Sequence, residues 1–167
     1  IEVPRTAPDP VNTVIVVHID GEPDVASNMP AQNADGVVNL PVRLGFIHNR
    51  GYGEHAHLSD LGADGYITNW VEPGARVEWM VDVKTPGNYT VELTYRSREN
   101  SALKASIGNS TTTVDLPSTR AAEERFHSVA GGVVHISEAG TATLVLQPAD
   151  TGWNPVEVQF VRILPEQ

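Results

Sequence analysis

The stretch from Gly65 to Ser97 alternates between apolar and polar residues in two runs, which are separated by a Thr-Pro-Gly-Asn break. The apolar positions of the first run are Ala75, Val77, Trp79, Val81 and Val83, and those of the second are Tyr89, Val91, Leu93 and Tyr95. Successive side chains of a strand point to opposite faces, and Pro-Gly marks a turn. The pattern therefore predicts two antiparallel strands with one buried face, and it places Trp79 in the core.

Similar strand patterns continue over most of the chain. The expected strands are Val37–Ile47, Gly65–Trp70, Ala75–Val83, Tyr89–Arg96, Ala102–Ile107, Thr111–Leu116, Val133–Ile136, Thr141–Gln147 and Val156–Leu164. Gly, Pro and Asn separate them, including the pair Gly131-Gly132. Only Pro117–Glu123 favours a short helical turn. Many short strands with regular turns predict an all-β protein, an antiparallel β-sandwich of the jelly-roll type.

The first 35 residues differ from the rest. Val11–Asp20 is a β-branched run that predicts one strand, and Glu22–Gly36 is polar and rich in turn residues. Compact domains seldom contain a structureless connection of that length. We therefore expect residues 1–35 to be an N-terminal strand and a linker, and residues 36–167 to form the β-sandwich.

Composition narrows the possible partners. The 21 acidic residues outnumber the 11 basic ones, and the formal net charge of −10 argues against nucleic acid and anionic membranes as partners. No apolar run approaches the roughly 20 residues that span a bilayer. The chain has no cysteine, which is compatible with export, and its start at Ile1 is typical of a mature or excised fragment. We expect a secreted or periplasmic bacterial protein.

The order of these patterns resembles that of the carbohydrate-binding modules of families 6 and 35, which have a galactose-binding-like β-sandwich. The resemblance covers about Val37 to Pro165 and includes GYITNW, the Trp79 strand and VEVQFVRILP. The segment Pro8–Pro23 resembles the closing strand of the β-domain that follows the catalytic barrel in family 29 glycoside hydrolases, the α-L-fucosidases. The resemblance implies a non-catalytic carbohydrate-binding domain of a secreted, fucosidase-like glycoside hydrolase. Its partners would be a glycan or polysaccharide and the catalytic domain of the parent enzyme.

The resemblance also implies a position for the sugar, at the loop end of the sandwich. Family members stack the sugar between two aromatic side chains and bind it with an Asn on the last strand. Tyr66 matches one aromatic residue, and Glu157 takes the position of the Asn. The second aromatic residue is expected in the loop before Phe126, where this chain reads Ala121-Ala122-Glu123.

The resemblance also bears on calcium. Calcium-containing members carry a Glu on the first strand and an Asp on the last, and this chain has Arg43 and Gln159 there. A guanidinium cannot bind a cation, so we expect no structural calcium at that position.

Exposed aromatic side chains and fixed polar groups together suit a sugar, which has a flat apolar face and a rim of hydroxyls. Trp70 and Trp153 stand beside turns, where each either packs at the edge of the core or offers such a face. The candidate carbohydrate-binding residues are Tyr66, Asn69, Trp70, Trp153, Asn154 and Glu157. An ionised Glu157 accepts hydrogen bonds but donates none, which favours neutral, hydroxyl-rich sugars over uronic acids.

Two alternative functions remain open. The first is a domain that braces the catalytic domain without binding sugar, for which we expect an apolar patch on one face. The second is a metal-binding β-protein, because His55 and His57 share one face of a strand, as metal ligands do. The further ligands of a cupin do not follow, and the Gly-rich lead-in favours a surface loop.

Catalysis is not expected. Glu54, Asp60 and Asp64 are close in sequence, and two carboxylates serve glycoside hydrolysis. Acids at this density in so acidic a chain are typical of a solvated surface. We therefore expect no catalytic residue, no metal and no cofactor.

Overall fold

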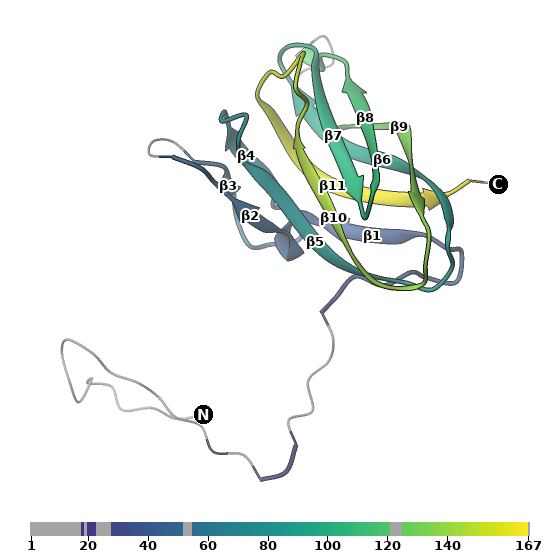
Figure 1. Ribbon diagram of the computed structural model, residues 1–167. Coiled ribbons are helices and arrows are strands. Elements are labelled where there is room, and N and C mark those ends of the chain that lie inside the picture. The colour runs from purple at the N-terminus through teal and green to yellow at the C-terminus, as the bar shows by residue number, and fades with distance from the viewer. Residues whose placement is uncertain (1–17, 19, 23–27, 52–54, 121–124, 167) are drawn as a thin grey trace, which may run out of the picture.

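The protein is a sandwich of two antiparallel β-sheets that face each other (Figure 1). The computed structural model describes residues 18, 20–22, 28–51, 55–120 and 125–166. The first sheet, the β11 sheet, has the order β3 (His57–Leu58), β4 (Ile67–Trp70), β11 (Val156–Pro165), β6 (Gly87–Ser97) and β9 (His127–Ile136), and β1 (Val38–Pro41) also pairs with β11. The second, the β5 sheet, has the order β2 (Phe46–His48), β5 (Arg76–Val83), β10 (Gly140–Pro148), β7 (Ser101–Ile107) and β8 (Ser110–Leu116). This architecture confirms the predicted all-β sandwich.

The core lies between the sheets and is built from the alternating positions of the strands. Val77 and Trp79 on β5 are fully buried, and so are Val91 and Leu93 on β6. The indole nitrogen of Trp79 donates a hydrogen bond to the carbonyl oxygen of Pro41 over 3.1 Å, so the buried N–H group has a partner. The prediction that Trp79 is a core residue is confirmed.

The single strand predicted at Val37–Ile47 is wrong, because the chain changes sheets there. It forms β1, a 3₁₀ helix η1 (Val42–Leu44) and β2, and β1 belongs to the β11 sheet whereas β2 belongs to the β5 sheet. A Cβ atom on Gly45 would lie 2.7 Å from Cγ1 of Val77 and 2.9 Å from Cε2 of Trp79. The crossing therefore needs a residue without a side chain, since the backbone passes directly over the core.

Strand β9 is longer than the predicted Val133–Ile136, because the Gly131-Gly132 pair is a bulge within the strand rather than a turn. The pairing of β9 with β6 shifts register there, and Gly132 has a φ of 73°. A Cβ atom on Gly132 would overlap the hydroxyl oxygen of Thr112 and lie 2.8 Å from its Cγ2 atom. Glycine is thus required by close approach as well as by backbone conformation.

The remaining differences concern short or undescribed segments. The two-residue strand β3 has no counterpart among the predicted strands. Almost all of the strand expected at Val11–Asp20, and residues 121–124, which include the end of the helical turn expected at Pro117–Glu123, lie outside the described residues.

The sandwich begins earlier in the chain than residue 36, the boundary that the sequence predicts. The backbone N–H of Asp82 donates to the carbonyl of Pro30 over 2.9 Å, and the N–H of Gln32 donates to the carbonyl of Asp82 over 3.0 Å. The segment that contains Pro30 and Gln32 therefore runs beside β5 as part of the hydrogen-bonded framework.

The side chain of Gln32 fastens this segment to the turn between β5 and β6. Gln32 is only 4% exposed, and its carbonyl oxygen accepts from the backbone N–H groups of Lys84 and Thr85 over 2.9 and 2.8 Å. Its amide nitrogen donates to the carbonyl of Gly36 over 2.8 Å and to the hydroxyl oxygen of Tyr89 over 2.6 Å. All four hydrogen-bonding positions of the buried amide are thus used.

We predict that Gln32→Ala lowers the free energy of unfolding by about 2–4 kcal/mol, because it leaves buried partners unsatisfied at about 1–3 kcal/mol each. Urea denaturation measures the change. The control is Asn39→Ala, an exposed position on β1. Equal losses for the two variants would contradict the role given to Gln32.

A second prediction concerns pH and the contact between β2 and β5. The Arg76 Nε donates to Glu78 over 2.6 Å, and His48 Nε2 lies 3.1 Å from the other carboxylate oxygen. The hydrogen bond from Arg76, followed by the charge of His48, holds the pKa of Glu78 below its ordinary value of 4.5, against the opposing effect of desolvation. A lowered pKa in the folded state stabilises the protein above the unfolded-state value, and this contribution is lost as the pH falls through the folded-state value.

We therefore expect Glu78→Gln to be less stable than the parent at neutral pH and to show a smaller loss of stability on acidification below about 4.5. Chemical denaturation over a pH series measures this, with the exposed Glu138→Gln as the control. Parallel curves for the parent and Glu78→Gln would contradict the prediction.

Candidate functional site

The candidate site lies at the end of the sandwich where β4 and β6 end and β11 begins. A pocket of about 350 Å³ opens there, which we call the loop-end pocket. Its walls include Asn69, Val71, Arg96, Ser97, Pro155 and Glu157. Ligand pockets commonly hold about 300–1,000 Å³, so the loop-end pocket suits a small ligand such as one or two sugar rings.

An ion pair crosses one wall of the loop-end pocket. Arg96 and Glu157 are opposite each other on β6 and β11, both are half-buried, and Arg96 Nε donates to the Glu157 carboxylate. The other carboxylate oxygen accepts from the hydroxyl of Thr68 on β4 over 2.9 Å. The hydrogen bond with Glu157 raises the pKa of Arg96, so the guanidinium of Arg96 keeps its proton and its positive charge.

This pairing corrects the role expected of Glu157. The carboxylate is not a lone acceptor facing a ligand, because each oxygen already has a partner and Arg96 balances its charge. The expected repulsion of uronic acids therefore loses its physical basis. Arg96 is a site residue that the sequence patterns alone do not single out, although its place opposite Glu157 follows once the register of β6 and β11 is known.

Two aromatic rings cover Arg96 on the outer face of the same sheet. The guanidinium carbon of Arg96 lies 4.9 Å from the centroid of the Tyr66 ring and 4.9 Å from that of the Phe126 ring. The two rings are 5.2 Å apart at an interplanar angle of 55°, and Arg96 Nη2 donates to the Tyr66 hydroxyl oxygen over 3.3 Å. A cation over aromatic faces is favourable by about 0.5–1 kcal/mol or more.

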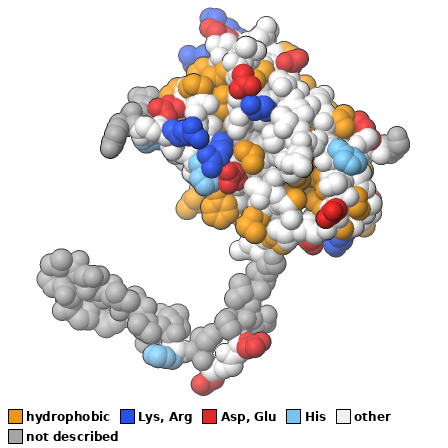
Figure 2. Space-filling view, in the orientation of Figure 1, with side chains coloured by type: hydrophobic (Ala, Val, Ile, Leu, Met, Phe, Trp, Pro, Cys, Tyr) orange, Lys and Arg blue, Asp and Glu red, His pale blue; other side chains and the backbone are white. Residues whose placement is uncertain are grey.

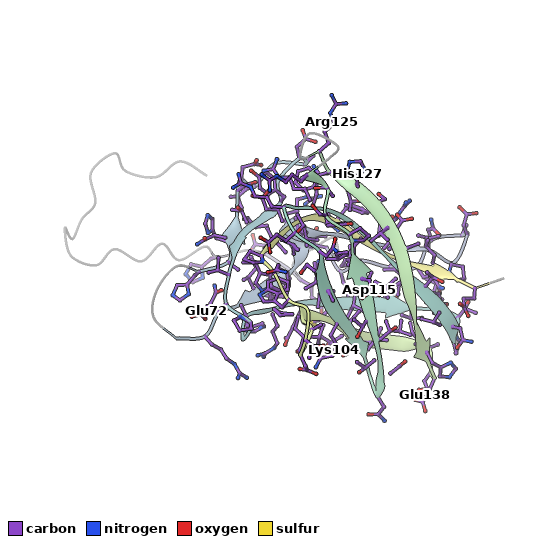
Figure 3. The ribbon with its side chains drawn as sticks, turned by 90° about the horizontal axis from the view of Figure 1, so that it is seen from above. Glu72, Lys104, Asp115, Arg125, His127 and Glu138 are labelled. Atoms are coloured by element: carbon purple, nitrogen blue, oxygen red, sulfur yellow. The ribbon has the colours of Figure 1, made fainter. Side chains whose placement is uncertain are left out.

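The aromatic–arginine cluster (Tyr66, Arg96 and Phe126) gives Tyr66 an aromatic neighbour that was not among the expected site residues. Its two rings touch each other, which leaves no room for a sugar between them. Phe126 is the aromatic neighbour of Tyr66, and it is half-buried between the exposed residues Arg125 and His127, which lie at the edge of the sandwich in Figure 3. The loop residues at which a second aromatic residue was expected, 121–123, lie outside the described residues.

Trp70 lies in the core rather than on the surface of the site. Its side chain has no exposed area, and its ring packs against that of Trp153, with centroids 5.8 Å apart at 58°. Trp153 is half-buried against the core. Of the two arrangements considered for Trp70, the structure therefore shows packing at the edge of the core, and the ring offers no face to a sugar.

The two candidate amides have separate positions. Asn69 has a φ of 54° at the irregular end of β4, a conformation that Asn tolerates better than most residues, and its side chain donates to the carbonyl of His55 over 3.3 Å. Asn154 instead donates to the carbonyl of Asn100 over 2.8 Å and lines a different cleft. The structure thus brings Tyr66, Asn69 and Glu157 together around Arg96, whereas Asn154 lies apart from them.

The residues considered for metal binding are dispersed. Arg43 is exposed on η1, and the side chain of Gln159 donates to the carbonyl of Asp64 over 3.4 Å. Nδ1 of His57 lies 2.8 Å from the carbonyl oxygen of His55. Within the described ranges, no three His, Cys, Asp or Glu side chains gather as metal ligands do.

The described acidic residues of the loop before β4 are not among the residues that line the loop-end pocket. Glu54 lies outside the described residues, and Asp60 accepts from the N–H of Gly62 over 2.6 Å. No helix in the described part of the chain has the length and apolar character to cross a membrane.

Comparisons with solved structures show which proteins share this fold. A family 35 carbohydrate-binding module from Clostridium thermocellum matches with a TM-score of 0.60 and 17% identity, over 78% of this chain and 98% of that one. A family 6 module of Cellvibrio mixtus lichenase 5A, solved with cellotriose, matches with a TM-score of 0.57 and 13% identity, over 77% and 97%. The Podospora anserina GH26-CBM35 β-(1,4)-mannanase matches with a TM-score of 0.60 and 20% identity, over 80% of this chain but only 28% of that one.

Sequence comparisons place the chain in a family. No curated protein matches it. The family described as "Domain of unknown function (DUF5077)" matches residues 52–163, which is more than half of the chain. The protein therefore belongs to the DUF5077 family, and its fold is the β-sandwich of the carbohydrate-binding modules.

Proposed function

We propose that this protein is a non-catalytic module that binds a glycan end in the loop-end pocket. The observation that carries the proposal is the pairing of Arg96 with Glu157 in the wall of a pocket large enough for a sugar ring. The likeness to carbohydrate-binding modules adds support from the fold.

The chemistry of the pocket wall suits vicinal hydroxyls, each of which both donates and accepts a hydrogen bond. A guanidinium has five N–H donors, and the Arg96 bonds to Glu157 and Tyr66 use two of them. Each oxygen of Glu157 has a second lone pair beyond its bond to Thr68 or Arg96. Two neighbouring hydroxyls can therefore accept from Arg96 and donate to Glu157.

The rim of the pocket supplies the remaining contacts. Asn69 lines it, and Val71, which also lines it and is 42% exposed, offers an apolar surface to the C–H face of a ring. Because Arg96 balances the charge of Glu157, both neutral sugars and uronic acids are acceptable ligands. Because the pocket offers a sugar few fixed hydrogen-bonding partners, we expect dissociation constants between about 1 mM and 1 μM. These correspond to binding free energies of roughly −4 to −8 kcal/mol.

The wider setting is also part of the proposal. We infer an exported, fucosidase-like glycoside hydrolase as the parent enzyme, with the residues before Pro30 as the end of its preceding β-domain and a linker. The likeness of Pro8–Pro23 to a family 29 segment supports this. Sequencing the coding region upstream of Ile1 tests it, since a different class of protein in frame would refute it.

We predict that the double variant Arg96→Met/Glu157→Gln loses most glycan binding, about 2 kcal/mol or more, while it remains folded. Replacing both partners leaves no uncompensated charge, unlike a single substitution. Calorimetric titration of the full chain with ligands found on a glycan array measures the effect, and far-ultraviolet circular dichroism checks the fold.

The matched control is Asn154→Ala, at the separate cleft, which should leave the affinity unchanged. If Asn154→Ala abolished binding and the double variant kept it, the sugar would bind at the Gly152–Pro155 turn instead. Trp70→Ala is unsuitable as a probe, because removal of a fully buried Trp costs about 3–5 kcal/mol of stability.

A further inference from the structure

The outer face of the β5 sheet carries an apolar hollow that the proposed sugar site does not use. The hollow has a volume of about 340 Å³, and its apolar lining consists of Met29, Pro30, Leu44, Gly45, Phe46 and Met80. Phe46 is 64% exposed and Met80 is 52% exposed. The two share a face because Phe46 is opposite Glu78, two residues before Met80. Figure 2 shows hydrophobic side chains on this face, over β2 and β5.

The walls of the hollow are formed by segments that are hydrogen-bonded in place. The backbone N–H of Asp82 on β5 donates to the carbonyl of Pro30 over 2.9 Å, which holds the first wall beside β5. The 3₁₀ helix η1 supplies Leu44, and the N–H of Gly45 donates to the carbonyl of Val42 over 3.0 Å. Strand β2 pairs with β5. The hollow is therefore largely formed in advance, as small-molecule pockets usually are.

One cation lies at the rim of the hollow without an acidic partner. Arg43 is exposed on η1 and belongs to the lining. Arg76, Arg96 and Arg162 each pair with a glutamate, whereas no described residue bonds to the guanidinium of Arg43. A guanidinium matches the geometry of a carboxylate, which it can bind through two parallel hydrogen bonds. The rim therefore suits a ligand that brings its own carboxylate.

The hollow suits a small molecule better than a protein surface or a sugar. Ligand pockets commonly hold about 300–1,000 Å³, whereas contacts between domains bury about 600–1,500 Å². On β5, Met80 lies between the outward-facing acids Glu78 and Asp82, so the apolar surface is narrow. A sugar needs several convergent polar groups, and among the described residues the lining supplies only the side chains of Asn28 and Arg43.

We propose that this hollow binds a small aromatic carboxylate. The ring of the ligand packs against Phe46 and Met80, and its carboxylate accepts hydrogen bonds from Arg43. Contacts of a ring with another ring, and of a thioether sulfur with a ring, favour an aromatic body over an aliphatic one. The lining contains no acidic side chain among the described residues, although the chain has a formal net charge of −10, so the ligand meets no like charge inside the hollow.

The composition of the chain allows a direct test. Its two methionines, Met29 and Met80, both line the hollow. A methionine-methyl NMR spectrum of the full chain therefore contains two signals, both from the hollow. Titration with cinnamate should shift both signals, because an aromatic ring displaces the resonances of nearby methyl groups.

Two further probes separate the ring from the charge. Cinnamamide has the same ring without the charge, and we expect it to bind about threefold to tenfold more weakly than cinnamate, because it loses the charge-assisted bonds to Arg43. Acetate has the charge without the ring, and it should leave both methyl signals in place. Equal affinities for cinnamate and cinnamamide would overturn the proposal.

Variants at exposed positions provide the second test. Arg43→Gln should lower the affinity for cinnamate to that for cinnamamide, whereas Phe46→Ser should weaken the binding of both. The matched control is Arg50→Gln, an exposed arginine outside the lining, which should change neither affinity. Far-ultraviolet circular dichroism checks that each variant is folded.

Two other results would contradict the proposal. The first is a cinnamate titration that leaves both methyl signals of the parent in place. The second is a shift of the same signals on concentrating the protein alone, since it would mean that a second copy occupies the hollow. The titrations contain no glycan, so failure of the proposed sugar site would leave this result standing.

Discussion

The last strand of the chain holds the first sheet together. β11 pairs along its whole length with β6, and on its other edge it pairs first with β4 and then with β1. Among the described strands, β1 pairs only with β11, and β4 pairs otherwise only with the two-residue strand β3. Because these pairings join residues far apart in sequence, folding must close long loops before β11 is in place, which is typical of slowly folding β-sandwiches.

The register of β11 against β6 also creates the candidate site. It sets Glu157 opposite Arg96, and from there Arg96 reaches the rings of Tyr66 and Phe126. A slip of one residue would send Glu157 to the opposite face of the sheet, towards the core. The polar wall of the pocket and the packing of the sandwich therefore depend on the same strand pairing.

The sequence was sufficient to predict elements that depend on local alternation. β5 and β6 have a strict period of two, and their turn has Pro and Gly at the expected places, so their existence and buried face were predictable. The change of sheets at Gly45 was not, because it depends on the approach of Val77 and Trp79, more than 30 residues away. The bulge at Gly132 was read as a turn for the same reason, since only the position of Thr112 distinguishes the two.

The residues of the candidate site could likewise be predicted only in part from local sequence patterns. Alternation and turns place Tyr66 and Asn69 near one end of a strand, but they do not reveal that Trp70 is covered by Trp153. Nor do they show that Arg96 neutralises Glu157, because that pair depends on which strands are neighbours.

The first and the last described segments of the sandwich are both hydrogen-bonded near the turn between β5 and β6, and this has a mechanical consequence. Gln32 binds the N–H groups of Lys84 and Thr85, and the N–H of Glu166 donates to the carbonyl of Asn88 over 2.9 Å. From this turn, the 11 residues of β6 lead about 35 Å to the loop-end pocket. A tensile force between the two ends of the sandwich would act first on this turn and on the adjoining pairings of β1 with β11 and of β11 with β6, at the end opposite to the pocket.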